Sequence, residues 1–246
     1  LTQIGWHYSD VFSEVTGPQG SYRIGGGSGV TLVLIDTGVD LANPDFKGDQ
    51  YLDHSQSGTC TGQHRFARFP KGIGDGVTPP NGGSGKLYHG TTVASLAAAP
   101  INGVGSVGAA PVAKLVVIKI RPQASGSYIP ALGCGLEHAR AAIAASGSYG
   151  VVNVSFRLHP TKGGYDGPAY RKKVEGEIAR LVRAGALLVA AGGNRVGAND
   201  RAAPYPASLP HVLGVGDSER RARVPGPWID VAAPGSGVHI AVSRGY

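Results

Sequence analysis

Short apolar segments of strand length recur along this chain and alternate with segments of helical periodicity. The segment 29–36 (GVTLVLID) is β-rich and bounded by glycines, which is typical of a strand buried on both faces. Similar runs lie at 115–120, 151–154, 186–191, 212–215 and 229–232. Helical stretches are expected at 91–99, 132–143 and 174–182, the last ending near Gly185. This alternation predicts a three-layer α/β fold with a mostly parallel central sheet and helices on both faces.

The length and composition are those of one globular unit. The 246 residues contain no internal repeat and no interdomain linker, so we expect a single domain over residues 1–246. Residues 48–86 are rich in Gly, Pro and polar residues and show little periodicity, which predicts a long surface excursion. The two cysteines, Cys60 and Cys134, allow one disulfide or two unrelated thiols and have no metal-ligand spacing.

Charge and hydropathy argue against two classes of partner. The net charge is +7, but the arginines and lysines are scattered, so we expect a solvated basic surface and no nucleic-acid partner. No apolar run approaches the roughly 20 residues that a membrane-spanning helix needs, so we expect no membrane partner. The chain begins at Leu1 and contains no Met, and we interpret it as a processed or recombinant form without a signal or pro-segment.

Three polar residues stand at the ends of predicted elements. Asp36 ends the first predicted strand, His89 opens an Ala-rich helical stretch, and Asn194 follows a strand and two glycines. Taken singly, each has an ordinary explanation as a turn Asp, a surface His or a turn Asn. In open parallel sheets, however, sites form at the carboxyl ends of strands. Together the three residues match the needs of a serine nucleophile, for which a carboxylate orients an imidazole base and fixed donors stabilise an oxyanion.

Six ordered segments carry a resemblance to a known family. They are IDTGVDLANPDF at 35–46, HGTTVASLAAA at 89–99, VVNVSF at 151–156, LLVAAGGN at 187–194, YPASLPHVLGVG at 205–216 and IDVAAPGSGVHIA at 229–241. With them the chain closely resembles the subtilisin-like serine proteases (subtilases) from about residue 29 to its end, and Asp precedes His as in that family. The resemblance implies that Asp36 is the triad carboxylate, that His89 is the general base and that Asn194 donates its side-chain amide to the oxyanion.

The resemblance also implies a cleft that binds a protein or peptide substrate as an added strand. Its expected rims are residues Ser155, Phe156 and Arg157 on one side and Ala191, Gly192 and Gly193 on the other. Arg157 replaces a glycine that is usual in the family. It could narrow the outer subsites or favour acidic substrate residues, although an exposed, mobile side chain is the simpler interpretation.

A structural calcium ion is a further implication of the resemblance. Asp45 and Asn102 match ligand positions of the family, and Gln3 is a third candidate. Carboxylate, amide and carbonyl oxygens suit Ca²⁺. Ordinary turn roles for Asp45 and Asn102 remain an alternative, and no organic cofactor is expected.

The nucleophile of the family is missing from the sequence. Its GTS-type motif occurs nowhere, and the chain runs from the VAAPG segment to Tyr246 without it. Ser236 and Ser243 lie nearby without the motif, so neither is assigned as the nucleophile. We therefore expect a catalytic domain that lacks its C-terminal part and is inactive alone, with the serine supplied from beyond Tyr246 by a second polypeptide. A partly recorded chain and a non-catalytic pseudoprotease or peptide-binding scaffold remain alternatives.

Two unrelated enzyme classes share single features with this chain. Residues 36–38 read DTG, as in aspartic proteases, but those enzymes need two carboxylates and no second DTG or DSG is present. A nucleotide site is also disfavoured, because no GxxxxGK[ST] motif occurs and no GxGxxG joins a strand to a helix. Since most subtilases work outside the cell, the resemblance implies a secreted or extracytoplasmic protein.

Overall fold

The computed structural model describes residues 25–47, 50–61, 65–68, 89–120, 128–158, 168–194, 203–218, 226–235 and 238. Its strands are β1 (Val30–Asp36), β2 (Gly58–Cys60), β3 (Phe66–Arg68), β4 (Lys114–Ile120), β5 (Tyr149–Val154), β6 (Leu187–Ala191), β7 (Val212–Asp217) and β8 (Val231–Ala233). Its helices are α3 (His89–Ala98), α4 (Ile129–Ser146) and α5 (Pro168–Arg183). The strands form one sheet in the order β3-β2-β4-β1-β5-β6-β7-β8. Every pairing except that of β2 with β3 is parallel.

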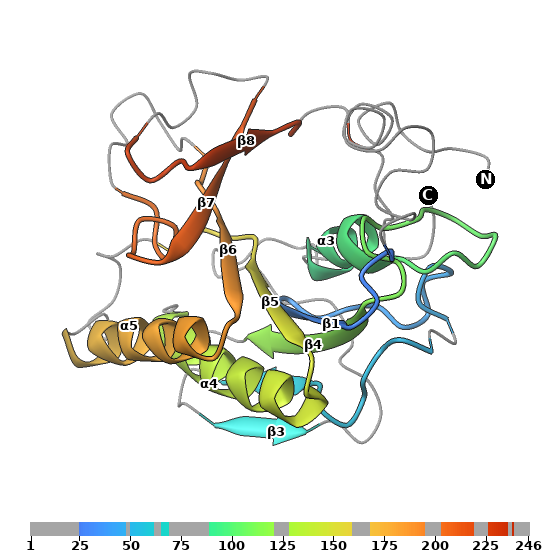
Figure 1. Ribbon diagram of the computed structural model, residues 1–246, viewed down its shortest axis with the longest axis horizontal. Helices are drawn as coiled ribbons and strands as arrows, with labels where there is room; N and C mark the ends of the chain where they lie inside the picture. Colours follow the sequence, from blue (N-terminus) through green and yellow to red (C-terminus); the bar gives the residue numbers. More distant parts are fainter. Residues whose placement is uncertain are drawn as a thin grey trace, which may run out of the picture.

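Helices cover both faces of the sheet (Figure 1). α4 and α5 pack against each other on one face, where α4 contacts β4 and β1 and α5 contacts β6. α3 lies on the opposite face and packs mainly over β1. The predicted three-layer α/β fold with a mostly parallel sheet is therefore confirmed.

The central strands β1 and β4 are buried on both faces, as their continuous apolar sequences predict. Val33 and Ile35 pack in the cluster under α4 and α5, whereas Leu34 packs in the cluster under α3. All three have no exposed surface, and neither has Val116 of β4. Burying each such side chain contributes about 1.5–3 kcal/mol. These two strands thus form the rigid centre of the domain, and Asp36 stands at its carboxyl edge.

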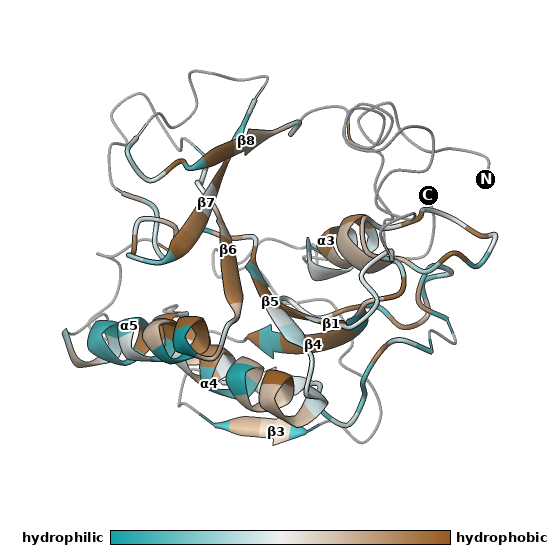
Figure 2. Ribbon diagram, viewed as in Figure 1, coloured by the Kyte–Doolittle hydropathy of each residue, from teal (hydrophilic) through white to brown (hydrophobic). Residues whose placement is uncertain are grey.

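α5 shows how one amphipathic helix covers the edge of this core. Val174, Ile178 and Leu181 are buried at helical spacing, whereas the rest of the surface of α5 is largely hydrophilic (Figure 2). Gly185 follows with a φ of +80°, a left-handed conformation that ends helices and that glycine adopts without strain. The predicted end of this helical stretch is confirmed.

The prediction of a surface excursion at 48–86 is wrong in its described part. β2 is fully buried and pairs in parallel with β4, and β3 pairs with β2 to form the edge of the sheet. Strands of three residues are too short to show periodicity, so no pattern in the sequence predicts them. Residues 69–86 lie outside the described residues.

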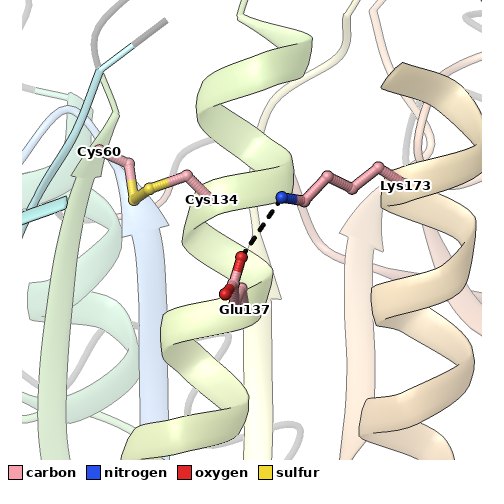
Figure 3. The surroundings of a disulfide bond; sticks show 4 residues. All are labelled: Cys60, Cys134, Glu137 and Lys173. Atoms are coloured by element: carbon pink, nitrogen blue, oxygen red, sulfur yellow. Dashed lines mark ion pairs between the residues drawn. A yellow bond between two sulfur atoms is a disulfide. The ribbon is translucent and has the colours of Figure 1, made fainter. Parts of the chain in front are cut away.

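The two cysteines form a disulfide that ties this edge of the sheet to α4. Cys60 ends β2 and Cys134 lies in α4, 74 positions away in the sequence, and both are buried. On the same helix, Glu137 forms an ion pair with Lys173 of α5 at 3.4 Å (Figure 3). α4 is thus linked to the sheet by a covalent bond and to α5 by an exposed ion pair.

The α3 face of the sheet is partly open along β6, β7 and β8. Burial alternates along β6, because successive side chains point to opposite faces of a strand. The strand register places five apolar side chains on the α3 face: Leu187, Val189, Leu213, Val215 and Val231. We call these residues the open sheet face; Leu187 is 47% exposed and Val231 is 45% exposed. Among the described helices, none packs mainly on this surface.

Candidate active site

Asp36 and His89 meet at the carboxyl end of β1. Asp36 is the last residue of β1 and is 1% exposed, and His89 is the first residue of α3. Nδ1 of His89 lies 2.9 Å from Oδ1 and 3.0 Å from Oδ2 of Asp36. The backbone N–H of Thr37 also donates to Oδ1, at 2.7 Å. The carboxylate is thus held on one side by its own turn and faces the imidazole on the other.

Hydrogen bonds and a close backbone contact fix α3 against the turn that follows β1. The N–H of Gly90 donates to Oγ1 of Thr37 at 2.8 Å, and the N–H of Asp40 donates to Oγ1 of Thr91 at 2.9 Å. A Cβ at position 90 would lie 2.0 Å from the carbonyl oxygen of Gly38. Only glycine lets the helix start approach this closely, and this approach brings His89 to Asp36.

The pair has the geometry of an oriented general base. An Nδ1–H donated to the buried carboxylate leaves Nε2 as the acceptor of the neutral imidazole. The side chain of His89 is 46% exposed, so this nitrogen can be reached from solvent. The arrangement also rules against the aspartic-protease alternative, since the side chain that faces Asp36 is a histidine and the sheet is mostly parallel rather than part of an all-β fold.

Asn194, which follows β6, lies at the same cleft as His89. The strand ends at Ala191, and the N–H of Gly192 donates to the carbonyl of Val215 in β7 at 2.7 Å. Gly193 follows with a φ of +87°, which turns the chain before Asn194. Asn194 is exposed, and it lines the same cleft as His89.

This cleft has a volume of about 780 Å³. The residues lining it are His89, Ser155, Phe156, Arg157, Ala191, Gly193, Asn194, the segment 215–217 and the segment 233–235. The structure therefore brings together His89, Asn194 and all the expected rim residues except Gly192, which is buried behind its neighbours. The segments 215–217 and 233–235 were not identified as site residues, although residues 215, 216 and 233–235 lie within stretches that carry the family resemblance.

A smaller cavity of about 320 Å³ shares His89, Phe156 and Arg157 with the cleft. Ile120, Tyr128, Phe156 and Leu158 give it a mainly apolar lining. Burial raises the pKa of the Tyr128 hydroxyl above its usual range, so this side chain is a neutral polar group at neutral pH. Tyr128 and Ile120 belong to no motif of the sequence, and only their position after folding reveals them.

Arg157 is half-buried, whereas the simpler interpretation expected an exposed side chain. It lines both the larger cleft and the smaller cavity. Its Nη1 donates to the backbone carbonyl of Asn194 at 3.1 Å. The side chain therefore joins the two rims of the cleft.

The residues expected to bind calcium take part in loop hydrogen bonds. Oδ1 and Oδ2 of Asp45 accept from the N–H and the hydroxyl of Ser106, at 3.0 Å and 2.6 Å. Oδ1 of Asn102 accepts from the N–H of Val104, and its Nδ2 points at the carbonyls of residues 44 and 45. As arranged, these side chains do not present a set of oxygens to a cation. Gln3 lies outside the described residues, and the calcium site stays a prediction.

The two serines that were not assigned as the nucleophile cannot be placed relative to the cleft. Ser236 and Ser243 are not among the described residues. Within the described part of the chain, no group of three or more His, Cys, Asp or Glu side chains could hold a metal ion. The helices described here include none with the length and hydrophobicity needed to cross a bilayer.

Comparisons with known proteins agree with this geometry. The sequence model described as "Subtilase family" matches residues 27–243. Thermitase of Thermoactinomyces vulgaris is 26% identical over 232 residues, which cover 92% of this chain and 70% of that protein. Subtilisin E of Bacillus subtilis is 28% identical over 225 residues, which cover 89% of this chain and 50% of that protein.

Solved structures show the same fold. The structure of sphericase gives a TM-score of 0.68 at 20% identity, over 99% of this chain and 77% of that one. The structure of the S41 psychrophilic protease gives a TM-score of 0.59 at 20% identity, over 86% of this chain and 59% of that one. The chain thus spans about half of the length of subtilisin E and a little more of the S41 protease.

Proposed function

Since the chain belongs to the subtilase family, we propose that it forms most of the catalytic domain of a serine endopeptidase. The observation that carries this proposal is the buried Asp36 beside Nδ1 of His89, at the edge of a cleft that Asn194 also lines. A histidine oriented by a buried carboxylate is the base that a serine nucleophile needs. The substrate is a protein or peptide that lies between the rims at 155–157 and 191–193.

The reaction proceeds through an acyl-enzyme. Nε2 of His89 takes the proton of the serine hydroxyl while the serine oxygen attacks the scissile carbonyl carbon. Asp36 stabilises the imidazolium that forms, and the side-chain amide of Asn194 donates a hydrogen bond to the oxyanion. The imidazolium then protonates the leaving amine, the C–N bond breaks, and a water molecule activated by His89 hydrolyses the acyl-enzyme.

The nucleophilic serine, on this proposal, comes from a segment outside these 246 residues, carried by a continuation of the chain or by a second polypeptide that stays associated after a nick. The absence of a GTS-type motif from the sequence supports this source.

The open sheet face supports the same idea energetically. Leu187, Val189, Leu213, Val215 and Val231 form an apolar surface beside the cleft, and two of them are nearly half exposed. Covering apolar surface contributes about 25 cal/mol per Å². An apolar helix that follows the serine would gain this stabilisation by packing on the open sheet face. The 246 residues alone are then expected to be inactive.

The absence of the serine motif from the sequence favours one alternative. The chain could act as a non-catalytic scaffold that binds peptides between the same rims. The scaffold needs neither the proton transfer at His89 nor the oxyanion donor at Asn194, so kinetics separate the two functions.

An extracytoplasmic location is part of the proposal. The buried Cys60–Cys134 disulfide supports it, because disulfides persist mainly in oxidising compartments. Recovery of the natural protein from the culture medium with no free thiols is the expected result. A cytosolic protein with two reduced cysteines contradicts it.

The test of the proposed function is the hydrolysis of a peptide substrate by the complete natural protein and its His89→Ala variant. Removal of the general base is expected to lower kcat by about 10⁴-fold or more. His54→Ala is a matched control, because His54 is exposed on a loop before β2 and its loss is expected to leave kcat unchanged. Equal turnover of the His89→Ala variant and the wild type contradicts the proposal, and peptide binding without any turnover in the wild type supports the scaffold.

A further inference from the structure

One side chain crosses between the two rims of the cleft. Arg157 follows β5, and its Nη1 donates to the carbonyl oxygen of Asn194, 37 positions later, at 3.1 Å. The same side chain lies against Gly193: a Cβ at position 193 would meet Cδ of Arg157 at 2.8 Å and Cβ of Pro204 at 3.3 Å. The aliphatic part of Arg157 therefore packs against Gly193 of the opposite rim, and its guanidinium binds the carbonyl of Asn194.

The backbone that carries Arg157 is itself fixed. The N–H of Leu158 donates to the carbonyl of Tyr205 at 2.9 Å, in an isolated antiparallel bridge. This bridge ties the segment after β5 to the segment before β7. Arg157 consequently reaches across the cleft from an anchored position and not from a free loop.

Residues 192–194 are held at both ends by these contacts. At one end the N–H of Gly192 donates to Val215, and at the other the carbonyl of Asn194 accepts from Arg157. Between them Gly193 has a φ of +87°, so the chain turns sharply at this point. Because the guanidinium fixes the peptide plane after Asn194, it also restricts the backbone torsions that aim the Asn194 side chain.

We propose that Arg157 is a positioning residue that holds Asn194 in the orientation needed to donate to the oxyanion. The inference rests on the proposed function, in which Asn194 is that donor. Donors that stabilise a transition state are effective when they are preorganised, since reorientation during the reaction costs free energy. Asn194 is exposed at the end of a strand, and Arg157 is the described side chain that fixes its carbonyl.

Kinetics of the complete natural protein test the inference. Arg157→Met keeps the aliphatic stem and removes the donor, and it is expected to lower kcat about tenfold with little change in KM, since small misplacements of catalytic groups cost up to about 10²-fold. Asn194→Ala is expected to lower kcat by about 10²–10³-fold. Since Arg157 acts through Asn194, the double variant should be no slower than Asn194→Ala alone. Arg157→Lys, which keeps a donor of similar length, should recover part of the loss.

Hydrogen exchange gives a readout that does not depend on turnover. Arg157→Met is expected to increase deuterium uptake at the amides of Gly193 and Asn194, because this span loses one of its two anchors. Arg180→Met is the matched control: Arg180 pairs with Glu177 within α5, away from the cleft, and its loss should leave uptake at 193 and 194 unchanged.

Each failure points to a different claim. Unchanged kcat in Asn194→Ala refutes the oxyanion role of Asn194, and the proposed function fails with the inference. If Asn194→Ala lowers kcat, and adding Arg157→Met to it lowers kcat by the same factor as Arg157→Met does alone, only the positioning role of Arg157 is refuted. Unchanged exchange at Gly193 and Asn194 in Arg157→Met overturns the inference independently of any activity.

Discussion

Nδ1 of His89 lies 2.9 Å from Oδ1 of Asp36, although 53 positions separate the two residues in the sequence. Two independent structural features produce this contact. Asp36 ends a strand buried on both faces, and α3 approaches the following turn so closely that residue 90 must be glycine. The pair of Asp36 and His89 is therefore fixed by the core and not by a flexible loop.

The Asp36→Asn substitution tests the carboxylate without changing its shape. It is expected to lower kcat by about 10⁴-fold, because an amide can no longer hold the imidazole in the required tautomer or stabilise the imidazolium. The measurement is peptide hydrolysis by the complete protein, with a circular dichroism spectrum to show that the fold is kept. A folded Asp36→Asn variant with wild-type kcat contradicts the role assigned to Asp36.

The Gly90→Ala substitution tests the close approach of α3. A Cβ here would lie 2.0 Å from the carbonyl oxygen of Gly38, so α3 must shift, and we expect a loss of about 1–3 kcal/mol in the free energy of unfolding. Gly176→Ala is the matched control, since Gly176 lies within α5 and its Cβ would meet only Nη1 of Arg180, at 3.7 Å. This control should gain up to about 1 kcal/mol. Urea unfolding measures both, and a Gly90→Ala variant as stable as the wild type refutes the argument.

The Cys60–Cys134 disulfide is expected to stabilise the fold mainly through the unfolded state. It closes a loop of 74 residues, for which chain entropy predicts about 4 kcal/mol. The variant with both cysteines changed to alanine should therefore unfold at a lower urea concentration and be insensitive to reducing agent. If dithiothreitol leaves the unfolding midpoint of the wild type unchanged, the disulfide does not contribute as described.

The contact between Asp45 and Ser106 is expected to stabilise its loop with or without calcium. The buried carboxylate accepts two hydrogen bonds from Ser106, and loss of these bonds in Asp45→Ala should cost about 1–3 kcal/mol. Thermal unfolding in calcium and in EDTA separates this effect from a bound ion. The resemblance to subtilases predicts that calcium raises the Tm of the wild type and not that of Asp45→Ala. If the wild type has the same Tm in calcium and in EDTA, the calcium site is contradicted.

The parts of the fold and site that could be predicted from the sequence are those with a local signature. The apolar run of β1 predicted a buried strand with Asp36 at its end, and the Ala-rich stretch after His89 predicted α3. Both signals arise within a few residues, since side-chain periodicity reflects burial directly. The six ordered segments then indicated which of these residues are expected to form one site.

The features that could not be predicted depend on contacts between distant segments. β2 and β3 are strands of three residues and have no periodicity of their own. Tyr128 lines a cavity beside His89 through the packing of α4, and Arg157 binds Asn194 across the cleft. The pairing of Cys60 with Cys134 was one of two possibilities until the structure placed β2 beside α4.

Covalent labelling with a fluorophosphonate tests the central claim most directly. The reagent is applied to the natural protein and to its His89→Ala variant, and the modified peptide is identified by mass spectrometry after denaturation. We predict one label per molecule, on a serine in a segment outside these 246 residues, and almost no labelling of the variant. A label on Ser236 or Ser243 contradicts the proposed source of the nucleophile. Equal labelling of both proteins contradicts the role of His89. A natural protein that takes up no label is not a serine peptidase of the proposed kind.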